Sequence, residues 1–208
     1  MGRRQEKLEE AVAGLPADQV LCCAGDVSDR AAVTAIAREV AERFGPVDTL
    51  VTSAGINSKV RTTGEIEPSD WDEGVAVNLT GVFNAVRAVL PGMRAARSGV
   101  IVNIASIAGL RASKLAGAAY SAAKHGVVAL THSINEEERE SGIRASAICP
   151  GEVATPILEL RPEPVSPERL AAMLKPEDVS AAVLFVATLP AHVCVPELII
   201  KPVYQVYQ

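Results

Sequence analysis

Apolar positions along the chain follow two alternating patterns. Short β-branched runs bounded by glycine, proline or turn residues predict buried strands, and apolar residues spaced three or four apart predict helices. The predicted strands are 20–24, 47–52, 99–104, 144–149 and 197–202. The predicted helices are 3–13, 29–43, one that starts at 68 and continues through 79–93, 120–140 and 176–189. Ser28 is the candidate N-cap of the second helix.

This alternation predicts an α/β fold with a parallel sheet and helices on both faces. In such sheets, ligands bind beyond the carboxyl ends of the strands. The 208 residues suffice for one domain with a sizeable core. Residues 156–174 contain four prolines and are predicted to form a flexible lid with a short helix.

Tyr120 and Lys124 lie four positions apart, so on a helix they share one face. A lysine ammonium beside a phenol favours the phenolate and lowers the phenol's pKa from about 10. The phenol then exchanges a proton with a substrate oxygen near neutral pH. Ser106, just past the strand 99–104, is placed to hydrogen-bond that oxygen. Taken alone, the spacing is more typical of a surface pair.

Further motifs appear in order along the chain. They are Gly25-Asp26-Val27, Ser53-Ala54-Gly55, Val77-Asn78-Leu79, Asn103-Ile104-Ala105-Ser106, the Tyr120/Lys124 pair, and Cys149-Pro150-Gly151 followed by Val153-Ala154-Thr155. Together they resemble the classical short-chain dehydrogenase/reductase (SDR) family of NAD(P)-dependent oxidoreductases over nearly the whole chain. The resemblance implies a Rossmann-like doubly wound parallel sheet. It also implies a single domain over 1–208 with a lid at about 156–174.

The resemblance implies an interconversion of an alcohol and a ketone by hydride transfer, with a small-molecule substrate. Tyr120 would be the general acid/base, and Ser106 would hold the substrate oxygen. Lys124 would lower the pKa of Tyr120 and bind the nicotinamide ribose. Asn78 would hold a water in a proton relay with the lysine.

The same resemblance implies cofactor contacts. Asp26 and Val27 would lie beside the adenine, and the backbone of Ser53, Ala54 and Gly55 would allow close approach of the cofactor. The nicotinamide side would be contacted by Pro150, Gly151, Val153 and Thr155, with Tyr120 and Lys124. Arg3 and Arg4 match the place where arginine favours the 2′-phosphate of NADP, so NADP is the expected cofactor, with NAD possible. The family has two asparagines where this chain has Thr52 and Ser53.

A glycine-rich turn is missing. A dinucleotide-binding fold opens with a strand, such a turn and a helix N-terminus that takes the pyrophosphate. No two of the 15 glycines lie closer than seven positions, so neither G-x-G nor G-x-x-x-G occurs. By resemblance, the chain starts after the family's second strand. We therefore expect an N-terminally truncated, incomplete domain that lacks a central strand between 20–24 and 47–52. An alternative is a non-catalytic binding or assembly subunit that has lost cofactor binding.

The charge composition argues against two classes of binding partner. The net charge is −5, with acidic and basic residues interspersed, which argues against nucleic acid and anionic membranes. The long uncharged stretch Val179–Pro196 is interrupted by Pro190 and His192 and favours a helix and a strand over a membrane span.

The cysteines and histidines predict no metal site. The four cysteines lack ligand spacing, and three of them fall in apolar runs, as expected of reduced core residues in a cytoplasmic protein. The three histidines have no convergent partners. The resemblance implies a homo-oligomer, a dimer or tetramer, formed through 79–93, 120–140 and the C-terminal strand.

Overall fold

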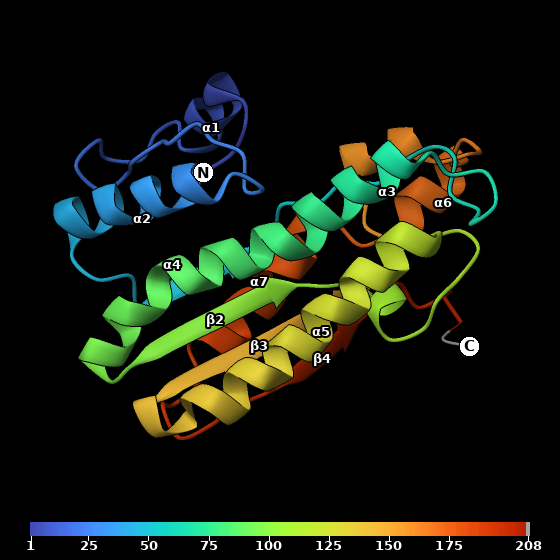
Figure 1. Ribbon diagram of the computed structural model, residues 1–208. Coiled ribbons are helices and arrows are strands. Elements are labelled where there is room, and N and C mark those ends of the chain that lie inside the picture. The colour runs from blue at the N-terminus through green and yellow to red at the C-terminus, as the bar shows by residue number, and fades with distance from the viewer. Residues whose placement is uncertain (207–208) are drawn as a thin grey trace.

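The computed structural model describes residues 1–206, and its centre is a parallel sheet (Figure 1). Four strands lie in the order β1 (Thr49–Thr52), β2 (Gly99–Ile104), β3 (Ile143–Pro150) and β4 (Glu197–Ile200). Adjacent strands are in parallel register, with Val51 opposite Val102 and Ile104 opposite Ile148. The predicted α/β class and four of the five predicted strands are confirmed.

The helices follow the predicted pattern with small shifts of their ends. They are α1 (Gln5–Ala11), α2 (Arg30–Phe44), α3 (Pro68–Val75), α4 (Gly81–Ala96), α5 (Ala118–Glu138), α6 (Pro167–Ala172) and α7 (Pro176–Ala187). Short helical turns cover Ala76–Thr80, Ile107–Gly109, Arg139–Ser141 and Pro156–Leu160. The predicted cap of α2 is wrong by one residue. Asp29 accepts hydrogen bonds from the amides of Ala31 and Ala32, while Ser28 bonds to Asp26 instead.

Helices cover the sheet on both faces. Helices α4 and α5 pack on one face, where Val86, Met93, Ile101 and Val127 are buried with 2% or less of their surface exposed. Helix α7 packs on the other face against β2, β3 and β4, with Val186 buried between them. The core is therefore aliphatic, as expected of a chain with 3% aromatic residues.

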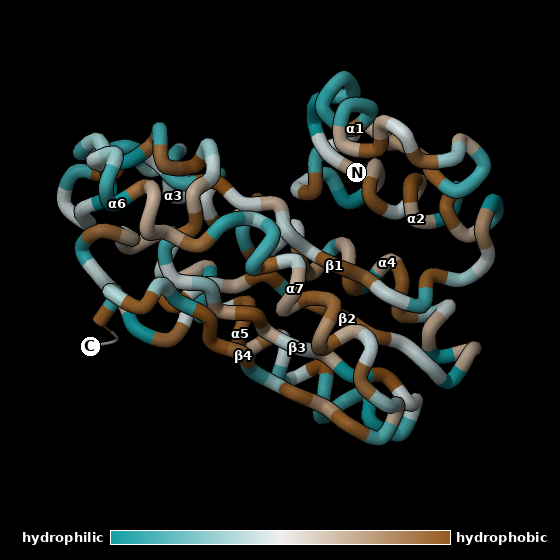
Figure 2. Tube along the Cα trace, turned by 180° about the vertical axis from the view of Figure 1, so that it is seen from behind, coloured by the Kyte–Doolittle hydropathy of each residue, from teal (hydrophilic) through white to brown (hydrophobic). Residues whose placement is uncertain are grey.

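The predicted strand 20–24 does not form. Its only ladder contact is an isolated bridge between Gly2 and Ala24, in which the Gly25 amide donates to the Gly2 carbonyl at 2.9 Å. A strand needs neighbours to satisfy its backbone groups. Figure 2 shows α1 and α2 apart from β1, and within residues 1–206 β1 pairs with β2 alone. As a result β1 is an edge strand, and Val51 is 42% exposed.

The cysteines are all free, but they are not all in the core. Cys23 and Cys149 are buried, Cys22 is half-buried and Cys194 is exposed. Cys194 lies outside the predicted strands, in the connection before β4.

A single long helix runs from Pro68 to Ala96, in which a π-helical turn joins α3 to α4. Among residues 1–206, it alone is long and apolar enough to cross a membrane by length and composition. A core helix passes the same test. This one buries Val82, Val86, Val89 and Met93 against the sheet.

The lid at 156–174 contains the predicted short helix, α6, and its two ends are fastened together. Val153 and Leu174 form an isolated bridge, and the Ala154 amide donates to the Leu174 carbonyl at 2.8 Å. Beneath the lid, Glu152 is 6% exposed. Glu152 accepts hydrogen bonds from the two lid arginines Arg161 and Arg169, and from Tyr204 near the C-terminus.

Candidate active site

The carboxyl ends of the strands bring the predicted motifs to one edge of the sheet. Ser53-Ala54-Gly55 follows β1, Ser106 follows β2 and Pro150-Gly151 ends β3. Tyr120 lies in the first turn of α5, which starts at Ala118. There, the Ser106 hydroxyl accepts a hydrogen bond from the Ala108 amide at 3.1 Å and lies close enough to Tyr120 to lower the pKa of its phenol. The serine and tyrosine predicted to act on one substrate oxygen thus lie together.

The phenol of Tyr120 is held in its neutral form. Burial raises its pKa, while the hydrogen bond with Ser106 and the charge of Arg61 lower it by less. The phenol therefore keeps its proton near pH 7.

Lys124 is buried and does not act on the phenol as predicted. Its ammonium lies 5.6 Å from the centre of the Tyr120 ring and donates to the Ile104 carbonyl at 2.7 Å. Burial lowers the pKa of Lys124 to about 8, with Cys149 opposing the shift. The pKa of Tyr120 is raised overall rather than lowered, because the burial of the phenol outweighs the effects of Ser106 and Arg61.

Asn78 is buried in the π-helical turn Ala76–Thr80. Its side-chain oxygen accepts from the Ile56 amide at 2.9 Å, and its Nδ2 donates to the Ile56 and Gly74 carbonyls at 3.0 and 2.9 Å. A Cβ on Gly55 would lie 3.1 Å from Asn78 Oδ1 and 3.9 Å from Lys124 Nζ. The asparagine therefore fixes the chain after β1 against the lysine.

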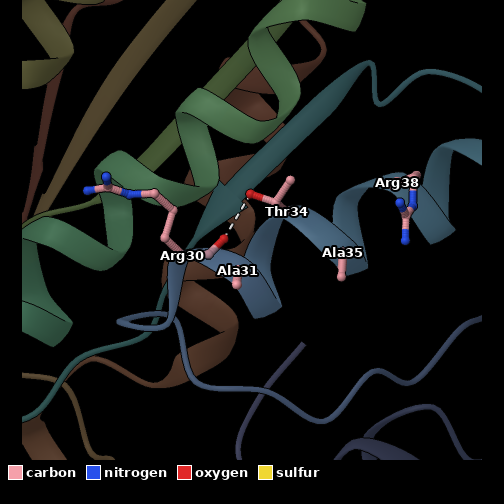
Figure 3. Close-up of a pocket in the computed structure, with 5 residues that line it drawn as sticks. All are labelled: Arg30, Ala31, Thr34, Ala35 and Arg38. Carbon is pink, nitrogen blue, oxygen red and sulfur yellow. Dashed lines mark hydrogen bonds between the residues drawn. The ribbon is translucent and has the colours of Figure 1, made fainter.

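A small polar cavity opens beside the phenol. It has a volume of about 130 Å³ and is lined by Ile56, Asn57, Ser58, Lys59, Asp70, Glu73, Gly74, Asn78, Ala119 and Tyr120. A larger surface hollow of about 480 Å³ lies along α2, between Arg30 and Arg38 (Figure 3). None of the predicted catalytic residues line that hollow, so we place the site at the smaller cavity.

A buried hydrogen-bond chain supports this end of the sheet. Thr52 donates to Asn103 at 2.8 Å, and Asn103 donates to Thr131 of α5 at 2.9 Å. Thr52 is one of the two positions where the family has asparagine. Its hydroxyl keeps a side-chain hydrogen bond there, so β1, β2 and α5 remain tied together.

The residues predicted for the adenine side lie near one another but at the surface. Hydrogen bonds from Ser28 lower the pKa of Asp26, and the charge of Arg3 lowers it further. Arg3 also faces Glu73 at 4.0 Å, in a pair that is exposed and therefore weak. Val27 packs on α4, where a Cβ on Gly81 would approach its side chain to 2.6 Å.

The residues predicted for the nicotinamide side form the start of the lid. Pro150 ends β3, Val153 bridges to Leu174 and Thr155 precedes the turn Pro156–Leu160. Gly151 is closely covered from the C-terminal segment, because a Cβ there would lie 2.1 Å from Gln205 Oε1. The sequence motif did not predict that Gln205 would lie against Gly151.

The partners of three side chains went unpredicted. Arg61 and Glu152 are buried charges, 7% and 6% exposed. Neither forms a spaced pattern with other polar residues, so only the fold reveals their partners. His132, predicted to have no partner, lies 2.7 Å from Glu197 of β4. That contact joins residues 65 positions apart, which spacing cannot show.

Comparison with known proteins decides the family. Residues 1–165 match the model of the short chain dehydrogenase family. The chain belongs to the short-chain dehydrogenase/reductase family. It is an oxidoreductase of that family, and levodione reductase from Leifsonia aquatica is 41% identical to it over 154 residues, which cover 74% of this chain and 57% of the relative.

Solved SDR structures superpose over nearly the whole chain. The closed form of a serine dehydrogenase complexed with NADP+ has a TM-score of 0.89 at 32% identity and covers 99% of this chain and 85% of that one. An alcohol dehydrogenase from Thermococcus sibiricus complexed with 5-hydroxy-NADP has a TM-score of 0.85 at 28% identity, covering 98% and 85%. These matches confirm the Rossmann-like sheet.

Proposed function

We propose that the chain is an NADP(H)-preferring SDR that interconverts an alcohol and a ketone by hydride transfer. The observation that carries this proposal is the placement of Ser106 beside the half-buried, neutral phenol of Tyr120 at the edge of a polar cavity. The levodione reductase relative, named as a reductase, supports a small ketone as substrate.

The residues of the chain divide the proton chemistry between them. Ser106 hydrogen-bonds and orients the substrate oxygen, and Tyr120 gives its proton to that oxygen as the carbonyl is reduced. In the reverse direction the phenolate takes the proton from the alcohol. Lys124, with a pKa of about 8, exchanges protons near neutral pH at the back of the site. Asn78 fixes the loop at Ile56 and so keeps Gly55 against that lysine.

The residues at the sheet edge fit a nicotinamide cofactor. Gly55 has no room for a side chain without crowding Asn78, and the exposed backbone of Ser53-Ala54-Gly55 leaves a path for a ligand to Lys124 and Tyr120. When bound, the nicotinamide would supply or accept the hydride. Arg3 and Asp26 would contact the adenosine end of the cofactor. The preference for NADP is supported by Arg3 and by neighbours complexed with NADP+ and 5-hydroxy-NADP.

The test is a titration of the 208-residue chain with NADPH and with NADH, followed by nicotinamide fluorescence and thermal unfolding. We expect saturable binding, tighter for NADPH. Tyr120→Phe should bind NADPH as the parent does, yet lose at least about 100-fold in the reduction of small cyclic ketones, because the proton donor is gone. A chain that unfolds cooperatively but binds neither nucleotide would contradict the proposal, as would a Tyr120→Phe variant with full activity.

We also propose that the chain forms a homo-oligomer through α4, α5 and β4. Phe83 on α4 and Ile199 on β4 are 38% and 43% exposed, so each of these two elements presents a large apolar side chain to solvent. Sedimentation of the chain gives the state, and a monomer at micromolar concentration would contradict this.

A further inference from the structure

Arg61 joins the loop after β1, the loop before α5 and the lid. It lies in the loop between β1 and α3. Its Nε donates to the Ser58 carbonyl at 2.7 Å, its Nη1 to the Leu115 carbonyl, and its Nη2 to the Leu160 carbonyl at 2.7 Å. These carbonyls belong to the loop after β1, the loop before α5 and the lid. One guanidinium thus fixes three segments that are far apart in the sequence.

The backbone of Arg61 is also attached to the start of α5. Its carbonyl accepts from the Ala118 amide at 3.2 Å. Gly117, with a φ of +82°, has no room for a side chain, because a Cβ there would lie 2.6 Å from Arg61 Cβ. Tyr120 comes two residues after Ala118 in the same helical turn. The position of Arg61 and that of the phenol are therefore linked by a rigid element.

The charge of Arg61 is not compensated by a neighbouring carboxylate. Its three side-chain partners are neutral backbone carbonyls, and no carboxylate within residues 1–206 forms an ion pair with it. A buried cation without a counter-ion favours a negative charge nearby. Burial lowers the pKa of Arg61, as does the charge of Arg161, and the interaction with Tyr120 opposes this.

We propose that Arg61 is a positioning residue that holds the walls of the site around Tyr120 and stabilises the phenolate left when Tyr120 gives up its proton. Five other charged groups lie around this pair. Lys124 lies over the phenol ring, while Lys59, Asp70 and Glu73 line the cavity, and Arg161 of the lid is paired with Glu152. Of these cations, Arg161 is compensated by its own carboxylate, and Lys124 is directed at the Ile104 carbonyl.

The experiment measures the ionisation of Tyr120 directly, without cofactor or substrate. Tyrosinate absorbance is recorded by stopped-flow pH jump before unfolding, and the same titration of Tyr120→Phe is subtracted to remove the other tyrosines. Arg61→Met deletes the charge. Arg61→Lys keeps the charge but cannot donate to the carbonyls of Ser58, Leu115 and Leu160 at once. Arg38→Met is the matched control, since it removes an arginine from an exposed ion pair on α2.

We expect the titration midpoint of Tyr120 to rise by about one pH unit in Arg61→Met, to rise less in Arg61→Lys, and to stay unchanged in Arg38→Met. If Arg61 only supported the fold, its loss would admit water to the phenol and lower the midpoint toward about 10. A lower or unchanged midpoint in Arg61→Met would therefore overturn the inference. The role of Arg61 in turnover rests on the proposed function. The shift in the titration midpoint of Tyr120 can be measured even in a chain that reduces no ketone.

Discussion

Strands β3 and β1 belong to the same sheet but differ in how they are covered. In β3, seven of eight residues are buried, between β2 and β4 and between α5 and α7. In β1, one residue of four is buried, and one edge has no strand beside it. The apolar run 20–24 has the composition of a strand and does not become one. The difference shows that an apolar run predicts a strand only where the fold supplies a partner on its edge.

The site draws on both regions. Tyr120, Lys124 and Ser106 come from the covered side, where α5 packs on β3 and on the turn after β2. Ser53-Ala54-Gly55, Arg3 and Asp26 come from the uncovered side. The groups proposed to transfer protons are thus rigidly held, while the groups expected to bind the cofactor lie on an exposed surface.

The largest expected effect is the pH dependence of stability that the buried ammonium of Lys124 causes. Its pKa is about 8 in the folded chain against an ordinary 10.5, so the unfolded chain binds the proton more tightly. The free energy of unfolding should therefore rise as pH increases from about 8 to 10.5, by about 3 kcal/mol relative to Lys124→Met. Urea unfolding of both proteins at several pH values checks this. Parallel pH profiles would show that the lysine is hydrated.

A pair of identical substitutions compares the two strands at directly opposed positions. Val102 is fully buried in β2, whereas Val51 beside it in β1 is 42% exposed. Val102→Ala should lower the free energy of unfolding by about 2–3 kcal/mol, since two buried methyl groups are lost and a cavity remains. Val51→Ala should cost less than about 1 kcal/mol. Equal losses in denaturant melts would mean that β1 is covered in solution by a partner.

The smallest effect concerns the cap of α2 in the uncovered region. Asp29→Ala removes the hydrogen bonds to the amides of Ala31 and Ala32 and should lower stability by about 1 kcal/mol. Ser28→Ala is the matched control, expected to cost less than Asp29→Ala because Ser28 caps no helix amide. If Ser28→Ala lost more stability than Asp29→Ala in thermal melts, Ser28 rather than Asp29 would be the N-cap of α2.

Sequence patterns predicted the helices and strands whose buried residues recur at regular spacing along the chain. Helix α5 and strand β2 were located within a few residues, because their buried positions recur at fixed spacing. Ser106, Tyr120 and Lys124 were found because strand ends and one helical turn place them together. The fold class followed from the alternation of these elements.

What the sequence did not show depends on contacts between distant segments. Arg61 bonds to carbonyls 54 and 99 positions away, and a carbonyl is present at every residue, so no residue type marks its partners. The direction of the pKa shift of Tyr120 depends on burial, which the spacing from Lys124 does not reveal. The failure of 20–24 as a strand depends on a neighbour that no local pattern describes.

The bridge between Val153 and Leu174 has an evolutionary consequence. Because the two ends of the lid pair with each other, an insertion or replacement between them leaves β3 and α7 in place. The lid can then vary in length and composition as an exchangeable module. Related chains with the same proton-transfer residues can thereby acquire different substrates without rebuilding the sheet.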